Sequence, residues 1–368
     1  SNSTGSNFSV AAQAVALPAR RGGLVAVWKR WTHEENTPKG GNVKQNAEQA
    51  LWRSVGAALV SLLLVVGCNA GAASPSPSEG DGDPAAYTVI ATTSVFADLA
   101  QLALGDSAII ETIIPAGVDV HTFEPSPADA QRLAGADLII MNGLGLDEWA
   151  LSLLEAAGKS EDEVLELGEG IDESHAWVYL EGEAHDEEGD AGHEHGGIDP
   201  HIWLDPQGAA IYVERIAARV AADLPGLAMQ IEGARDAGLA EIAALDEELR
   251  VGFSAVDATK RKIVTFHDAF GYFARAYEVE IVGVAVEAPG QEPSAKEIAA
   301  LIDAIDGAGV TSVFSEVQFP SKVLDQIAAE TGATVLEDLF SDALGDAPAD
   351  SYLGAMRSNA SAILASFR

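Results

Sequence analysis

Three histidines and one aspartate occupy positions from which they could together bind a metal ion. His121, His267 and Asp338 each come just after a predicted strand, and His201 lies in the segment 199–206. Ligands of α/β proteins bind beyond the carboxyl ends of strands, and imidazole and carboxylate groups are ligands of Zn(II). The gaps between the four residues are 80, 66 and 71 residues, so only the fold could bring them together.

The spacing of these residues does not by itself distinguish a metal site from ordinary structural roles. A single histidine at a strand end more often serves as a cap or a buried polar residue. The sequence also contains no HExxH or CxxC pair that would hold two ligands on one element. Both interpretations therefore stay open at this level.

Strands and helices alternate in two parts of the chain, which predicts parallel βαβ units. Patterns of β-branched and apolar residues predict strands at 87–93, 108–115, 138–141, 262–266, 280–286, 311–314 and 333–336. Apolar periodicity and capping signals predict helices at 95–104, 207–222, 227–255, 269–277 and 349–367, and helices beginning at Ser126 and Ser294. The prediction is an α/β fold: an N-terminal domain at 87–206, connecting helices at 207–256 and a C-terminal domain at 257–368. The long helix is expected to join the domains rigidly, with the metal site between them.

Charge and cysteine content exclude several functions. The chain has a net charge of −36, and its first 67 residues hold only 7 of the 21 basic and 3 of the 57 acidic residues. The remainder is therefore strongly acidic, which disfavours binding to nucleic acid or to an anionic lipid surface. Cys68 is the single cysteine, so neither an intrachain disulfide nor a site with several cysteine ligands can form.

The segment that ends at Cys68 has the features of an export signal. Residues 54–67 form an uncharged apolar run that is too short for a confident transmembrane helix and typical of a signal-peptide core. The run ends in Val-Val-Gly-Cys, which resembles the bacterial lipobox and implies lipid attachment at Cys68. We expect 1–53 to be an unstructured upstream segment, 54–68 a signal peptide and 69–86 a flexible tether rich in Pro, Gly and Ser.

A second group of histidines lies in a stretch without periodicity at 172–197. His185, His193 and His195 stand there among acidic residues and glycines, which predicts a loop. One interpretation is a solvated acidic insert whose histidines have no role. The other is an accessory loop that binds metal weakly and exchanges it quickly.

Five segments resemble the solute-binding lipoproteins of zinc and manganese ABC transporters, the ZnuA/TroA-like cluster A-I family. They cover nearly all of 87–368 in the order of that family and are VDVHTFEPSPAD (118–129), NGLGLDEW (142–149), DPHIWLDP (199–206), TFHDAFGYF (265–273) and EPSAK (292–296). The resemblance implies that His121, His201 and His267 are metal ligands. It also implies a carboxylate ligand in the C-terminal domain, which matches Asp338, with Glu337 and Asp342 as nearby competitors. Glu316 fits a further family motif and is expected to support the site without binding the ion.

The resemblance also implies a function. It predicts a non-catalytic, monomeric receptor, lipid-anchored outside the cytoplasm, that delivers Zn(II) to the permease and ATPase of an ABC importer. Manganese-preferring relatives carry Glu where this chain has His267, so zinc is favoured and Mn(II) is the alternative. A zinc hydrolase or lyase would need an open metal position with a general base, and an adhesin role would leave no motif in the sequence.

Overall fold

The computed structural model describes residues 86–171, 198–286, 289–319 and 322–368. Residues Ala85–Arg368 form one compact unit. The predicted upstream segment, signal peptide and loop at 172–197 lie outside the described residues, as does nearly all of the predicted tether. The exact domain boundaries stay predictions. Among the described residues, no helix is both long enough and apolar enough to cross a bilayer.

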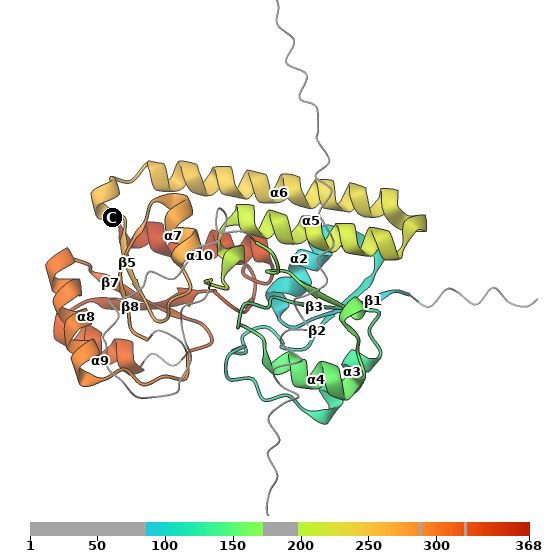
Figure 1. The fold of residues 1–368 in the computed structure, drawn as a ribbon. Helices are drawn as coiled ribbons and strands as arrows, with labels where there is room; N and C mark the ends of the chain where they lie inside the picture. The colour runs from blue at the N-terminus through green and yellow to red at the C-terminus, as the bar shows by residue number, and fades with distance from the viewer. Residues whose placement is uncertain (1–85, 172–197, 287–288, 320–321) are drawn as a thin grey trace, which may run out of the picture. The chain divides into compact units, whose positions relative to one another are not determined.

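The first half is built on a four-stranded parallel sheet in the order β2-β1-β3-β4. Its two central strands are buried, because they are almost wholly apolar and are covered on both faces. The strands are β1 (Thr88–Ala91), β2 (Ile109–Thr112), β3 (Leu138–Met141) and β4 (Val164–Glu166). The helices between them are α2 (Ser94–Leu104), α3 (Pro127–Ala134) and α4 (Trp149–Ala157) (Figure 1).

The second half repeats this topology with a parallel sheet in the order β6-β5-β7-β8. Its strands are β5 (Lys262–Thr265), β6 (Glu280–Val284), β7 (Ser312–Glu316) and β8 (Thr334–Leu339). Its helices are α7 (Gly271–Tyr277), α8 (Ala295–Ala308) and α9 (Lys322–Thr331). The helix predicted from Ser294 begins with a capping box between Ser294 and Glu297. In each sheet the strand order reverses beside the first strand of that half, where such folds bind ligands.

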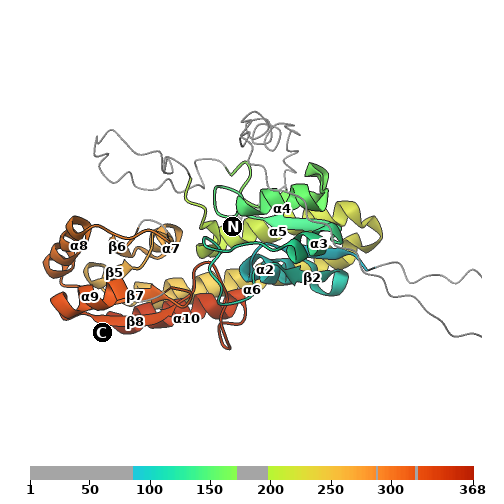
Figure 2. The same ribbon diagram turned by 90° about the horizontal axis from the view of Figure 1, so that it is seen from below.

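Three further helices complete the fold: α5 (Pro206–Asp223), α6 (Ala228–Ser254) and α10 (Tyr352–Ser366). Helix α6 has 27 residues and packs on α2 and α5 in the first half and on α7 and α10 in the second (Figures 1 and 2). Its backbone comes so close to α2 at Gly238 that a Cβ there would lie 2.7 Å from the Leu102 carbonyl oxygen. One apolar core runs through both halves.

The predicted fold class is confirmed: both sheets are parallel and a long helix joins them. Most predicted strands and helices are found within a few residues of their expected ends. Helices α4 and α9 and strand β4 were not predicted. Strand β8 extends to Leu339, three residues beyond its predicted end at Leu336, and this extension changes which carboxylate follows the strand.

Candidate metal centre

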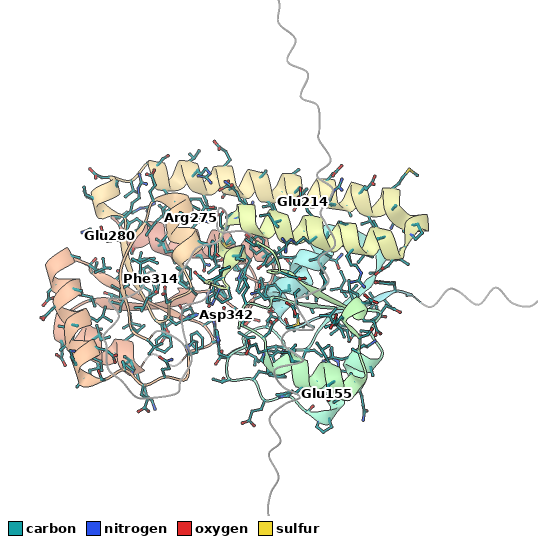
Figure 3. All side chains as sticks on the ribbon, in the orientation of Figure 1. Glu155, Glu214, Arg275, Glu280, Phe314 and Asp342 are labelled. Carbon is teal, nitrogen blue, oxygen red and sulfur yellow. The ribbon has the colours of Figure 1, made fainter. Side chains whose placement is uncertain are left out.

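Four side chains from both halves converge on one point: His121, His201, His267 and Asp342. One nitrogen or oxygen atom from each lies within 4.8 Å of those of the other three. Figure 3 labels Asp342, which lies in the region between the two sheets. His201, His267 and Asp342 are each only 1% exposed, and the side chain of His121 is 19% exposed. The group is therefore nearly closed to solvent, with His121 on its open side.

The distances within the group suit a small ion with four ligands. The carboxylate oxygens of Asp342 lie 3.4 Å from Nε2 of His121, 3.3 Å from Nε2 of His201 and 3.5 Å from Nε2 of His267. Zinc bonds to imidazole nitrogen are about 2.0–2.1 Å long, so two ligands of a tetrahedral ion are about 3.3–3.4 Å apart. The carboxylate–imidazole separations already match that spacing.

Buried atoms without hydrogen-bond partners also indicate that the group binds a small cation. Nε2 of all three histidines and Oδ1 of Asp342 are buried and accept or donate no hydrogen bond among the described residues. Leaving such atoms unpaired is costly, because each has lost its water without a replacement. A cation at their common centre would satisfy all four atoms at once.

Local structure orients two of the histidines from the side opposite this centre. The Asp199 carboxylate is 2.8 Å from Nδ1 of His201 and also accepts the backbone N–H of that residue. Oε1 of Glu316, at the end of β7, lies 3.3 Å from Nδ1 of His267, which is an ion-pair contact without hydrogen-bond geometry. Carboxylates at Nδ1 favour the tautomer in which Nε2 is free to bind metal. Glu316 therefore has the supporting position expected from the sequence.

His121 is held by its own loop. Its backbone N–H donates to Oδ1 of Asp119 at 2.9 Å, and the hydroxyl of Thr122 donates to the other oxygen of Asp119 at 2.6 Å. The loop is also attached to the second half, because the N–H of Gly117 donates to the carbonyl of Leu344 at 2.8 Å. These bonds bring His121 to the loop that carries Asp342.

Protonation of the group depends strongly on its carboxylates. Burial lowers the pKa of His201, but the charges of Asp199 and Asp342 outweigh burial and raise it to about 10. Burial also lowers the pKa of His267, while Glu316 and then Asp342 raise it overall. Burial raises the pKa of Asp342, yet the neighbouring histidines hold it well below its usual range. Without a metal ion, protons balance the buried negative charge, and a metal ion would have to displace them.

Among the side chains that the structure describes, Asp342 is the carboxylate brought to the three histidines, and the assignment of a ligand to Asp338 stays a prediction. Asp338 lies inside β8, and its side chain is outside the described part of the structure. Strand β8 continues past Asp338 because it pairs with β7 as far as Leu339, which lies opposite Glu316. Asp342 is the first acidic residue after the observed end of β8, which lies three residues beyond the predicted end.

The remaining predicted site residues lie outside the described residues. These are the lipid-attachment residue Cys68 and the histidines of the accessory loop, His185, His193 and His195. Their predicted roles stay predictions.

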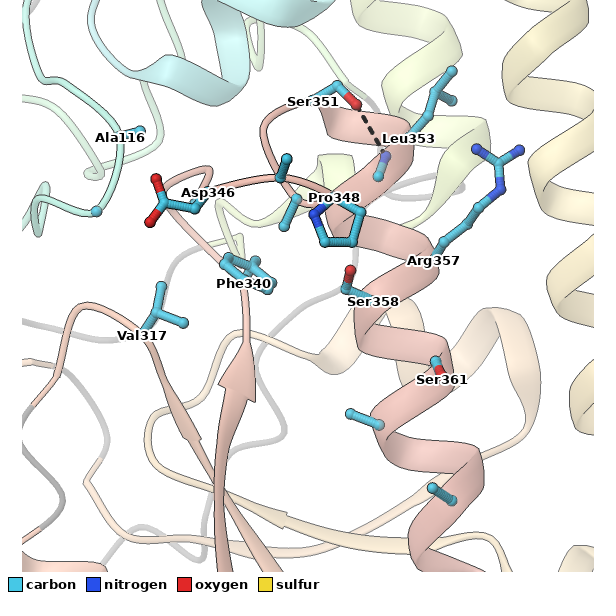
Figure 4. Close-up of a pocket in the computed structure, with 17 residues that line it drawn as sticks. Ala116, Val317, Phe340, Asp346, Pro348, Ser351, Leu353, Arg357, Ser358 and Ser361 are labelled. Carbon is cyan, nitrogen blue, oxygen red and sulfur yellow. Dashed lines mark hydrogen bonds between the residues drawn. The ribbon is translucent and has the colours of Figure 1, made fainter.

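A separate cavity of about 1190 Å³ lies between α10, the loop that precedes it and residues 116–117 (Figure 4). Its walls are mostly small side chains such as Gly354, Ser358 and Ser361. Asp346 and Arg357 are the charged residues among those that line it. Since none of the four converging side chains is among the lining residues, this cavity is distinct from the candidate metal centre.

Two parallel α/β halves that enclose a His3Asp group define a receptor for a metal ion. The family described as "Zinc-uptake complex component A periplasmic", ZnuA, matches residues 89–366. The chain therefore belongs to the ZnuA family, which confirms the resemblance seen in the sequence. The proteins of this family are substrate-binding components of metal ABC transporters, so the chain is a receptor and the hydrolase alternative is excluded.

Individual relatives differ in the metal for which they are named. The iron ABC transporter substrate-binding lipoprotein MtsA of Streptococcus pyogenes serotype M1 is 28% identical over 309 residues, 82% of this chain and 94% of the relative. The manganese ABC transporter substrate-binding lipoprotein scaA of Streptococcus gordonii is 29% identical over 305 residues, 81% and 94% of the two chains. The solved periplasmic zinc-binding protein TroA of Treponema pallidum is 26% identical, with a TM-score of 0.66 and coverage of 77% and 99%. The family description and these names agree with the predicted extracytoplasmic, membrane-attached location.

Proposed function

We propose that this chain binds Zn(II) through His121, His201, His267 and Asp342 and delivers it to the permease and ATPase of an ABC importer. The observation that carries the proposal is the convergence of three imidazole nitrogens and one carboxylate, all within 4.8 Å of one another. These atoms are buried and lack hydrogen-bond partners among the described residues. Their natural partner is a cation that enters and leaves, because the site belongs to a transport receptor.

Ligand chemistry supports zinc over manganese. Three nitrogens and one carboxylate suit four-coordinate Zn(II), whereas Mn(II) prefers more oxygen ligands and water. The burial of the site also opposes an ion that keeps its water, because His201, His267 and Asp342 are each only 1% exposed. Relatives named for iron, manganese and zinc are similarly close to this chain. The zinc proposal therefore depends on the ligands, chiefly His267.

Titration of the metal-free protein with Zn(II) and with Mn(II) tests this proposal. His121→Ala, His201→Ala and His267→Ala should each weaken Zn(II) binding by about 100-fold or more, since each removes one of four ligands. His267→Glu should shift preference toward Mn(II), because it replaces a nitrogen ligand with oxygen. His185→Ala is the matched control in the accessory loop and should leave the tight affinity unchanged. Tight Zn(II) binding by all three alanine variants would refute the site.

We also propose that the receptor is a monomer held to the membrane by a lipid on Cys68. The Val-Val-Gly-Cys motif and the acidic body support this arrangement, since the body would gain little from contact with an anionic bilayer. Mass spectrometry of the membrane fraction should find the lipid on Cys68. The Cys68→Ser variant should then leave that fraction, and its retention there would count against the anchor.

A further inference from the structure

The segment 199–203 is fixed in place by side chains from several elements. The amide of Asn142 donates to the carbonyl of Pro200 at 3.2 Å. From the second half, the hydroxyl of Tyr272 donates to the carbonyl of Asp199 at 3.0 Å. The hydroxyl of Tyr352, on α10, donates to the carbonyl of Trp203 at 2.8 Å. These bonds hold the backbone that carries His201.

Trp203 extends this arrangement to the loop of the carboxylate. Its indole N–H donates to the carbonyl oxygen of Ser341 at 2.9 Å, and Ser341 directly precedes Asp342. The Trp203 side chain is 1% exposed, and its ring packs edge-on against Phe96 with centroids 5.0 Å apart. The ring of Trp203 therefore packs against the first half, while the acceptor of its N–H belongs to the second half.

The position of the Ser341 carbonyl affects the placement of the Asp342 carboxylate. A peptide group immediately before Asp342 fixes the direction in which that carboxylate leaves the backbone. The carboxylate must reach three imidazoles that lie 3.3–3.5 Å away. The side chain of Ser341 is also bonded, because the amide of Gln318 donates to its hydroxyl at 2.8 Å. Gln318, however, belongs to the second half, so it cannot set the spacing between the two halves.

We propose that Trp203 is a positioning residue for metal binding. Its N–H bond to Ser341 sets the distance between the Asp342 carboxylate and the imidazole of His201, two residues before Trp203 in the chain. This inference rests on the proposed function, in which both side chains bind the ion. Trp203 itself does not bind the metal. Losing the N–H should leave the ligands present but poorly placed, so the bound ion should dissociate faster.

Two changes at position 203 test this inference in the full chain with Zn(II) as the probe. Trp203→Phe keeps an aromatic ring and removes the N–H. Benzothienylalanine incorporated at the same position keeps the shape of the indole and replaces only the N–H with sulfur. Each should weaken Zn(II) affinity by roughly tenfold, the lower end of what outer partners of metal ligands contribute. The loss should lie mainly in a faster dissociation rate, measured by stopped-flow transfer of zinc to a chelator.

Tyr277→Phe is the matched control. Tyr277 is 2% exposed, and its hydroxyl donates to Asp246 at 3.2 Å, a bond between α7 and α6 that touches no segment with a candidate ligand. The control should lower the melting temperature while leaving Zn(II) affinity within about twofold of the original, because its lost bond is an ordinary structural one. A structural role alone at position 203 would give the same pattern as this control.

The outcomes separate the two proposals. If the unchanged protein does not bind Zn(II) tightly, the proposed function fails. If it does bind tightly and the position 203 variants match Tyr277→Phe, only the positioning role of Trp203 is refuted. Should Trp203→Phe fail to fold, the benzothienylalanine protein decides the question, because its packing is preserved.

Discussion

Replacing Asp342 by asparagine gives the most direct test of the site. The Asp342→Asn variant would keep the size of the side chain and one oxygen, but would lose the negative charge that faces three imidazoles at 3.3–3.5 Å. Structural zinc sites bind with about 10–16 kcal/mol, which is ~2.5–4 kcal/mol for each of four ligands. At about 1.4 kcal/mol for each factor of ten, this corresponds to a loss of affinity of about 60- to 700-fold. Because the amide of asparagine keeps one oxygen that could still bind the ion, we expect a loss of Zn(II) affinity near the lower end of this range.

The Asp338→Asn variant is the matched comparison, because it makes the same chemical change four residues away in β8. Competition against a chromophoric zinc chelator would measure both affinities, and thermal unfolding with and without zinc would show whether each variant folds. We expect Asp338→Asn to stay within a few fold of the original affinity. A large loss in Asp338→Asn together with little change in Asp342→Asn would refute the assignment of the carboxylate.

Two further predictions concern protons and packing. The pKa of His201 is raised to about 10 in the folded protein, above its unfolded value of about 6.5. Its protonation therefore stabilises the metal-free protein fully below pH 6.5, and this stability is lost as the pH rises through about 10. Zn(II) needs the neutral imidazole, so the rise in melting temperature caused by zinc should grow from pH 6.5 to 8.5. Calorimetry in buffers of different ionisation enthalpy should detect proton release on binding, and binding without proton release would contradict this reasoning. Gly238→Ala should destabilise the protein by about 1–3 kcal/mol, because its Cβ would overlap the Leu102 carbonyl. Gly233→Ala in the same helix meets no atom within 4 Å and should stabilise by roughly 0.5–1 kcal/mol in urea unfolding. Equal effects of the two substitutions would show that the contact with α2 is unimportant.

The three histidines could be predicted from the sequence because each lies in a motif of its own. Their convergence could not be predicted from spacing alone, since it depends on which strand ends face each other across the two halves. The family resemblance supplied that information. The position of Asp342 just after β8 was harder to predict. Glu337 and Asp338 are residue types that are unfavourable in strands, so the local pattern indicates that β8 ends before them. Pairing with β7 carries the strand through both acidic residues to Leu339, and that tertiary contact is not visible in the local pattern.

Helix α9 and strand β4, two of the elements that the sequence did not predict, differ in how clearly their local sequence pattern indicates them. Helix α9 buries Leu324 and Ile327, three residues apart on one face, so its helical periodicity was present but short. Strand β4 has only three residues, and its existence depends on pairing with β3 at the sheet edge. The hydrogen bond of Trp203 to Ser341 and the ion-pair contact of Glu316 with His267 link distant parts of the sequence. Such contacts are properties of the folded chain and have no local pattern.

The close approach of Gly238 to Leu102 fixes the position of α6 along α2, and α6 in turn contacts helices of the second half. An α-helix advances about 1.5 Å and turns about 100° for each residue, so the point where α6 is fixed on α2 determines where its far end meets α7 and α10. A slip of one residue at Gly238 would displace the second sheet by about 1.5 Å relative to the first. Metal–ligand distances in a formed site lie within about 0.2 Å of their ideal values. The contact between Gly238 and Leu102 therefore contributes to whether His201 and Asp342 can bind one ion.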